Sequence, residues 1–204
     1  MPPKAKYTRE EIVDIALQLV AEKGIDALNA RNLGAALGTS TRPVFTAFKN
    51  MNELSEEVRA AAMRKFDSYA ENSVMNPAFK NVGMQMIHFA AEQPKLFQLL
   101  YMSEHQETIP FDKLFTELGD TAGNCVHFIM RDYGLNEQEA MLLFRNLWLY
   151  TFGVCVLIAS KVCRYDAEEV SNMLSSEFMA MMALIKSGKA FSLPKYTPGA
   201  ELPM

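Results

Sequence analysis

The sequence predicts an all-α protein in which an N-terminal three-helix unit precedes a larger helical domain. Two observations support this fold class: apolar residues recur at helical spacing along the chain, and no segment alternates with the two-residue period of a strand. Several of the apolar stripes also begin with a capping residue that is followed three positions later by Glu. We expect about nine helices, divided into an N-terminal domain (residues 1–52), a second helical domain (53–188) and a loose C-terminal tail (189–204).

The first helix is predicted to start at Thr8, because Thr8 and Glu11 have the spacing of a capping box. An apolar stripe with helical period follows and stops at Gly24. The stripe comprises Ile12, Val13, Ala16, Leu17 and Val20.

The segment 27–54 predicts two short helices joined by a tight turn. Asn29 is a good N-cap for the first helix, and Gly38 can adopt the left-handed conformation that ends it. Ser40 is expected to cap the second helix, whose first turn tolerates Pro43. The inward-facing residues form two pairs spaced four apart, Leu33 with Leu37 and Val44 with Phe48. Two helices around a short turn are typical of the helix-turn-helix, whose second helix enters the major groove of DNA.

Later segments predict further helices. Asn50 and Glu53 repeat the capping-box spacing and begin a long helix that extends to about residue 72. Further helices are expected at 77–93, 94–102, 112–133, 136–161 and 166–188, with a polar loop at 103–110. Asp112, Asn136 and Asp166 are the expected N-caps of the last three.

Residues 7–58 resemble the N-terminal domain of tetracycline-repressor-type (TetR family) regulators. The resemblance rests on the stretches 12–24, 31–38 and 40–50, together with Leu54. A looser similarity to one C-terminal type of that family covers 89–97 and, later, Leu147, Trp148 and Gly153. The resemblance implies a dimeric, ligand-responsive regulator of transcription.

The candidate DNA-binding residues belong to the helix-turn-helix: Asn29, Arg31, Ser40, Thr41, Arg42, Pro43, Phe45, Thr46 and Lys49. Asn29 and Arg31 are expected to meet phosphate, and Ser40 to contact phosphate in addition to capping. Base edges are assigned to Thr41, Arg42 and Thr46, because a guanidinium suits the paired acceptors of guanine. Phe45 has two open interpretations, a contact with a thymine methyl or sugar and a place in the core.

The chain departs from the family pattern at two positions. Family members often carry His-Phe at the end of the recognition helix, where this chain has Ala47-Phe48, and a Lys where it has Met51. Arg31, Arg42 and Lys49 would then carry more of the electrostatic attraction to DNA.

Charge distribution agrees with DNA binding only modestly. Residues 1–66 hold ten Lys or Arg against eight Asp or Glu, a net charge of +2, whereas the remaining residues hold ten against sixteen, a net of −6. Together these give the formal net charge of −4. A positive end on an acidic body would orient the protein toward DNA.

Composition and motifs favour a cytoplasmic protein without catalytic chemistry. The three cysteines, Cys125, Cys155 and Cys163, have no metal-binding spacing and indicate a reducing compartment. The N-terminus does not resemble a signal peptide, and the longest uncharged run, 146–160, is shorter than a membrane span. No nucleophile-elbow, phosphate-loop or dinucleotide motif is present, and His88 with Glu92 is a weak metal candidate. We expect no enzyme activity, no cofactor and no metal.

A ligand chamber is expected in the second domain, for a hydrophobic or aromatic small molecule. The candidate ligand-binding residues are aromatic or histidine side chains: Phe89, Phe97, Tyr101, His105, Phe115, Phe128, Trp148 and Phe152. Met86, Met102 and Met130 are expected around them, since Met adapts to varied shapes. The alternative interpretation of the set is an ordinary hydrophobic core.

The last two long helices, about 137–161 and 167–188, are expected to form a homodimer interface. Residues 147–159 are apolar nearly all round, which predicts either a central core helix or a four-helix seam between two subunits. The resemblance favours the seam, and two-fold symmetry would present two recognition helices to a palindromic operator.

The sequence therefore predicts a ligand-responsive regulator, a repressor that a hydrophobic or aromatic molecule releases from its operator. The competing hypothesis is a helical small-molecule-binding or protein-interaction module with weak or lost DNA binding. Ala47 and Met51 are the features that support this competing hypothesis.

Overall fold

The computed structural model describes residues 7–71, 78–103, 110, 113–117 and 119–190. Within these ranges the regular elements are all helical, as expected. In chain order they are α1 (Arg9–Lys23), the 3-10 turn η1 (Ile25–Ala27), α2 (Ala30–Ala36), α3 (Arg42–Ala47), α4 (Met51–Glu71), α5 (Ala78–Glu92), α6 (Pro94–Tyr101), α7 (Leu114–Glu117), α8 (Gly119–Tyr133), α9 (Glu137–Ala159) and α10 (Ala167–Lys186). The four-residue α7 and α8 take the place of the one helix expected after Asp112, which itself lies outside the described residues.

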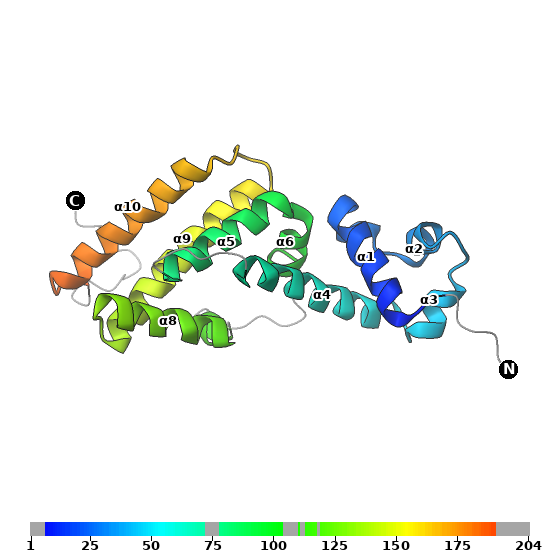
Figure 1. The fold of residues 1–204 in the computed structure, drawn as a ribbon, viewed down its shortest axis with the longest axis horizontal. Helices are drawn as coiled ribbons and strands as arrows, with labels where there is room; N and C mark the ends of the chain where they lie inside the picture. The colour runs from blue at the N-terminus through cyan, green and yellow to red at the C-terminus, as the bar shows by residue number, and fades with distance from the viewer. Residues whose placement is uncertain (1–6, 72–77, 104–109, 111–112, 118, 191–204) are drawn as a thin grey trace, which may run out of the picture.

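The molecule is elongated, with a small head and a larger body (Figure 1). Helices α1, α2 and α3 form the head at the N-terminal end, and α4 extends from the head toward the body. Helices α5, α8, α9 and α10 form the body, in which α9 packs against α5, α8 and α10. Helix α6 contacts α1 as well as α4, α5 and α9, so it joins the head to the body beside α4.

Most helix starts follow the expected capping chemistry. Thr8 and Glu11 form a full capping box, and so do Asn136 and Glu139. The side chains of Asn29 and Asp166 accept bonds from the backbone N–H three residues later. These contacts satisfy N–H groups that would otherwise lack partners at the helix ends.

Two predicted caps differ in detail. The prediction that Ser40 caps α3 is wrong: the N-cap is Thr41, and the Ser40 Oγ accepts a long 3.4 Å bond from the N–H of Arg42, only two residues on. At α4 the Asn50 side chain accepts from the N–H of Glu53 as expected, but the Glu53 carboxylate accepts from the N–H of Lys49 rather than Asn50.

The core consists of two apolar clusters. One runs without interruption from α1–α4 through α5 and α6 to α9, and the other joins Phe115 and α8 to α9 and α10. The head therefore shares its core with the body along α4. The domain limits at 52 and 188 stay a prediction.

Helix α9 lies at the centre of the body. Among the described residues it is the one helix long and apolar enough, by length and composition, to cross a membrane, although only 39% of its most apolar window is buried. In the structure it packs against the helices of the body. Part of its apolar surface therefore remains exposed, at Leu149 and Leu157.

Candidate DNA-recognition head and ligand cavity

The turn between α2 and α3 brings the two helices close together. Leu37 ends α2, and Gly38 follows with a φ of +62°, the left-handed conformation expected for it. The N–H of Gly38 donates to the Ala35 carbonyl and the N–H of Thr39 to the Gly34 carbonyl, which is the Schellman pattern. A Cβ on Gly34 would lie 3.2 Å from the Thr39 carbonyl oxygen. Gly34, which the sequence prediction did not single out, allows this close approach of the turn.

Helix α3 presents one polar and aromatic face to solvent. Val44 and Phe48 are buried as predicted, whereas Arg42 and Thr46 are exposed. Phe45 is 52% exposed, which excludes the core interpretation of this residue. The exposed face therefore groups a guanidinium, an aromatic ring and a hydroxyl within one helical turn.

The other candidates lie around this face with different exposures. Asn29, Arg31, Ser40 and Lys49 are exposed, and Thr41 and Pro43 are half-buried. The side chain of Asn29 is already bonded to the N–H of Asn32 as the α2 cap. The Thr41 methyl lies against Gly34, so this residue shapes the turn as well as facing outward.

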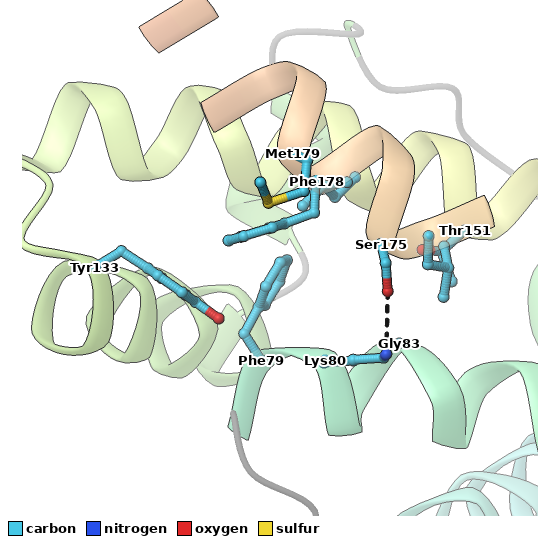
Figure 2. A pocket seen from close by; sticks show the side chains of 10 residues that line it. Phe79, Lys80, Gly83, Tyr133, Thr151, Ser175, Phe178 and Met179 are labelled. Atoms are coloured by element: carbon cyan, nitrogen blue, oxygen red, sulfur yellow. Dashed lines mark hydrogen bonds between the residues drawn. The ribbon is translucent and has the colours of Figure 1, made fainter. Parts of the chain in front are cut away.

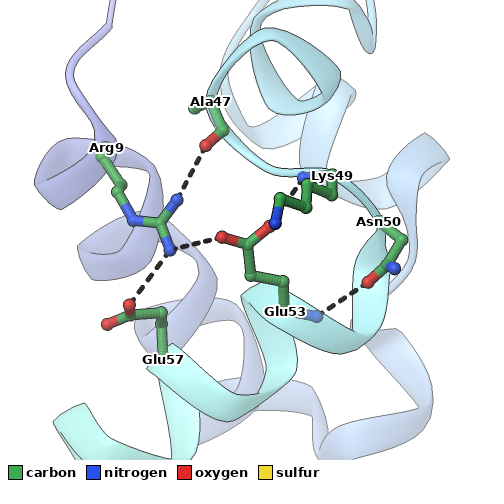
Figure 3. Close-up of polar contacts among 6 residues, drawn as sticks. All are labelled: Arg9, Ala47, Lys49, Asn50, Glu53 and Glu57. Carbon is green, nitrogen blue, oxygen red and sulfur yellow. Dashed lines mark hydrogen bonds and ion pairs between the residues drawn. The ribbon is translucent and has the colours of Figure 1, made fainter.

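Arg9 fixes the end of α3 against α1 and α4, a role that the sequence prediction missed. Its guanidinium donates to the Ala47 carbonyl at 2.8 Å and pairs with Glu53 at 2.9 Å and Glu57 at 3.0 Å (Figure 3). It also lies 4.2 Å from the centre of the Phe48 ring. We call Arg9, Ala47, Glu53 and Glu57 the Arg9 cluster. The only sequence signal for it was the acidic pair one turn apart at the start of α4.

These contacts change the acid–base properties of two members. The N–H of Lys49 and then the Arg9 guanidinium lower the pKa of Glu53 below its ordinary value of 4.5. Bonds to Glu57 and Glu53 raise the pKa of Arg9. Both groups are solvent-accessible, so the Arg9 cluster orients helices more than it adds stability.

The body contains a mostly apolar cavity of about 210 Å³ between α4, α5, α6, α8 and α9. Phe66 and Met63 of α4, Tyr101 of α6 and Trp148 of α9 contribute to its wall. The remaining lining residues are Asp67, Phe79, Val82, Gly83, Met86, Cys125, Phe144, Leu147 and Thr151. We call this space the central cavity.

The structure brings most of the predicted ligand residues to the central cavity or its aromatic wall. Tyr101 and Trp148 line the cavity directly, and Met86 joins them. The rings of Phe89, Phe97, Phe115 and Phe152 contact lining residues from behind. Phe128 does not take part, since its ring lies under Arg131 on α8, and His105 lies outside the described residues.

The aromatic wall connects the central cavity to α4 and α6. Phe66 is in edge contact with both Phe89 and Tyr101, and Trp148 stacks on Phe152 with an interplanar angle of 6°. Burial raises the pKa of Tyr101, which keeps its hydroxyl neutral. Phe66 was not among the ligand-binding residues that the sequence predicted.

Hydrogen bonds join α6 to α4 and to α9, and α6 also contacts the head. Arg59 of α4 donates to the Leu100 carbonyl of α6, and Gln98 of α6 donates to the Ala159 carbonyl at the end of α9. The Lys95 side chain lies about 3.5 Å from the Cβ position of Gly24, at the end of α1. Helices α4 and α6 thus touch both the central cavity and the head.

His88 and Glu92, the weak metal candidates of the sequence, each form a hydrogen bond with a tyrosine. His88 shares a hydrogen bond with the Tyr165 hydroxyl, and Glu92 accepts from the Tyr69 hydroxyl. No group of three potential ligands occurs among the described residues.

Comparisons with known proteins agree with this architecture. A family described as bacterial regulatory proteins, tetR family, matches residues 12–58, and one described as tetracyclin repressor-like, C-terminal domain, matches residues 79–177. A comparison with curated proteins finds no match.

Solved structures share the fold at low sequence identity. A TetR-like transcriptional regulator from Rhodococcus sp. RHA1 has a TM-score of 0.62 and 14% identity, covering 90% of this chain and 99% of that one. A TetR variant from Acinetobacter baumannii AYE, solved in complex with minocycline, has a TM-score of 0.51 and 19% identity, covering 93% and 100%. The two domain matches show that the chain belongs to the TetR family, and the solved structures share its fold. It is a DNA-binding transcriptional regulator.

Proposed function

We propose that this regulator is a repressor that a hydrophobic or aromatic small molecule releases from a palindromic operator. The observation that carries the proposal is the position of the central cavity, whose wall includes Phe66 of α4 and Tyr101 of α6. Both helices also contact the head. A molecule that enters the cavity contacts side chains on two helices that also touch the head.

DNA recognition is assigned to the exposed face of α3. Arg42 and Thr46 are proposed to contact base edges, and Phe45 a thymine methyl or sugar. Arg31 and Lys49 flank this face and are proposed to bind phosphate, as are Asn29 and Ser40. Thr41 is also proposed to contact a base edge, and with Pro43 it sets the start of the helix.

The operator is proposed to be bound by a homodimer formed through α9 and α10. Leu149 and Leu157 of α9 are 38% and 46% exposed, and Gly153 lies between them at helical spacing with no atom within 4 Å of its Cβ position. Met173 of α10 is 40% exposed and lines a surface hollow with Tyr150 of α9. An exposed apolar stripe with a small residue at its centre lets two helices approach closely. We expect the dimer in the cytoplasm, where its DNA is.

Release follows from thermodynamic linkage. If the effector binds best when the two heads are spaced wrongly for the operator, it weakens DNA binding by the factor by which DNA weakens effector binding. The effector would distinguish the two conformations through Phe66 and Tyr101, because these residues belong to the helices that would shift.

The experiment that tests the proposal is operator binding with and without effector. A screen of apolar and aromatic compounds is read through Trp148, the single tryptophan of the chain, whose ring lines the central cavity. Hits are then titrated against a complex of the protein with its own upstream DNA. We expect hits to change Trp148 emission and to lower DNA affinity. Compounds that bind beside Trp148 without changing DNA affinity would contradict release as the mechanism.

The competing function, a helical ligand-binding module without DNA binding, rested on Ala47 and Met51. In the structure the carbonyl of Ala47 is held by Arg9, and Met51 is half-buried against the core. Both positions therefore have structural roles at the junction of α3 and α4. Absence of any salt-dependent binding to the upstream DNA would favour the competing function.

A further inference from the structure

A second cavity of about 240 Å³ lies next to the central cavity, between α5, α8, α9 and α10. Apolar side chains make most of its wall: Phe79, Leu147, Leu174, Phe178 and Met179 (Figure 2). We call it the lateral cavity. It shares Phe79, Gly83, Leu147 and Thr151 with the central cavity but includes no residue of α4 or α6.

One cation faces this apolar space. Lys80 of α5 is half-buried in the wall, and its ammonium donates to the Ser175 hydroxyl of α10 at 3.1 Å (Figure 2). The Ser175 hydroxyl donates its hydrogen bond to the Ser171 carbonyl at 2.8 Å, so its oxygen can only accept from Lys80. Among the described residues no carboxylate forms an ion pair with Lys80.

This arrangement leaves donor capacity at the cavity wall. An ammonium has three N–H donors and no acceptor, and the Ser175 oxygen occupies one of them. A partly desolvated cation gains most from an anionic acceptor, because a charge-assisted hydrogen bond is about twice as strong as a neutral one. The neighbouring Leu174 and Phe178 are apolar, so they favour contact with the hydrocarbon part of a ligand over contact with water.

The size of the lateral cavity restricts the ligand. An apolar cavity of roughly 150 Å³ accommodates benzene, so a cavity of about 240 Å³ has room for one ring and a short chain. The rings of Phe178 and Tyr133, with centroids 4.9 Å apart, form an aromatic side for such a ring.

From these observations we propose that the lateral cavity is a second ligand site, specific for a small organic carboxylate with an aromatic or alkyl body. The carboxylate pairs with Lys80 beside Ser175, and the body lies against Leu174 and Phe178. The site is separate from the effector site of the proposed function, because it does not touch α4 or α6.

The test compares 4-phenylbutyrate with its neutral analogue 4-phenylbutanol by isothermal titration calorimetry on the full chain. We expect the carboxylate to bind at least tenfold more tightly than the alcohol, and the Lys80→Met variant to lose that preference, because Met keeps the apolar stem and removes the charge. Lys186→Met, at the exposed end of α10, is the matched control and keeps the preference. If Lys80→Met does not fold, Lys80→Gln replaces it.

Three results would overturn this site: equal affinity for acid and alcohol, a preference that survives in the Lys80 variant, or no binding of either probe. Its failure is distinguishable from failure of the effector proposal, because that proposal is read through Trp148 and operator affinity. Trp148 lines the central cavity and not the lateral one.

Discussion

At the scale of residues, the recognition surface is a short exposed face on a firmly held helix. Arg42 and Phe45 project from α3, while Val44 and Phe48 anchor its other side in the core. The Thr46 hydroxyl donates to the Arg42 carbonyl at 2.9 Å, so its oxygen is turned toward its own helix. Arg42 is therefore the residue of this face with the most donor capacity for a base edge.

Replacing Arg42 with Ala should reduce affinity for the operator by about 1–3 kcal/mol and relax specificity at one base position in each half-site. The loss follows from the bidentate bonds that a guanidinium makes to guanine. Fluorescence anisotropy with the operator and single-base variants of it measures both effects. An affinity loss that is the same for every sequence would show that Arg42 contacts phosphate instead.

Lys49→Ala is the complementary variant, because Lys49 is assigned to phosphate. We expect weaker binding to all DNA sequences alike and a decrease of about 1 in the slope of log affinity against log salt. The same titration at several salt concentrations measures the slope. Unchanged nonspecific binding would refute the assignment.

The pH dependence of the Arg9 cluster follows from the lowered pKa of Glu53. Because the folded protein binds this proton more weakly than the unfolded chain, Glu53 stabilises the fold above 4.5, and the contribution is lost as pH falls through the lower folded pKa. The Tm of Glu53→Gln should therefore lie below that of the wild type near neutral pH, with the difference shrinking below 4.5. Thermal melts over this range measure it, and a difference independent of pH would contradict the prediction.

At the scale of elements, α5 is the main packing partner of α9, and it also packs on α4, α6 and α8. Gly83 of α5 faces Thr151 of α9 and borders both cavities. A Cβ there would lie 3.8 Å from the Thr151 Oγ1 and 4.0 Å from the Leu174 Cδ1, which are ordinary contact distances. The helix pair therefore has room for one methyl group.

Gly83→Ala should stabilise the protein by about 0.4–1 kcal/mol, because it reduces the entropy of the unfolded chain without a clash. Urea unfolding measures the change. Gly34→Ala is the contrasting variant and should be destabilising, since its Cβ would lie 3.2 Å from the Thr39 carbonyl oxygen. Destabilisation by Gly83→Ala would show that the wall between the two cavities does not accept a methyl group.

At the scale of the whole molecule, one subunit leaves the outer side of α9 uncovered. Helix α9 is apolar over its length, yet Leu149, Gly153 and Leu157 remain accessible. Burial of this stripe against a second copy would remove it from water and give one particle two heads related by a two-fold axis. The proposed dimer would in this way give α9 a partner on each side.

Gly153→Leu should dissociate the proposed dimer, because a large side chain at the centre of the seam separates the two copies of α9. Light scattering should then give a mass near 22.9 kDa, against twice that value for the wild type. Gly123→Leu, at an equally open position on α8, is the matched control and should stay dimeric. A wild type with the mass of one subunit would contradict the seam.

The sequence alone determined the all-α class, the helix-turn-helix and most helix starts, because periodicity and capping are local properties that neighbouring residues specify. It also indicated an aromatic set in the body, of which Tyr101 and Trp148 line the central cavity. Only the tertiary structure decided that Phe45 is exposed, that Arg9 holds the end of α3, and that Lys80 meets Ser175. The contacts of Arg9 and Lys80 join residues up to 95 positions apart in the chain. Such contacts, like the exposure of Phe45, depend on how helices pack rather than on any local pattern.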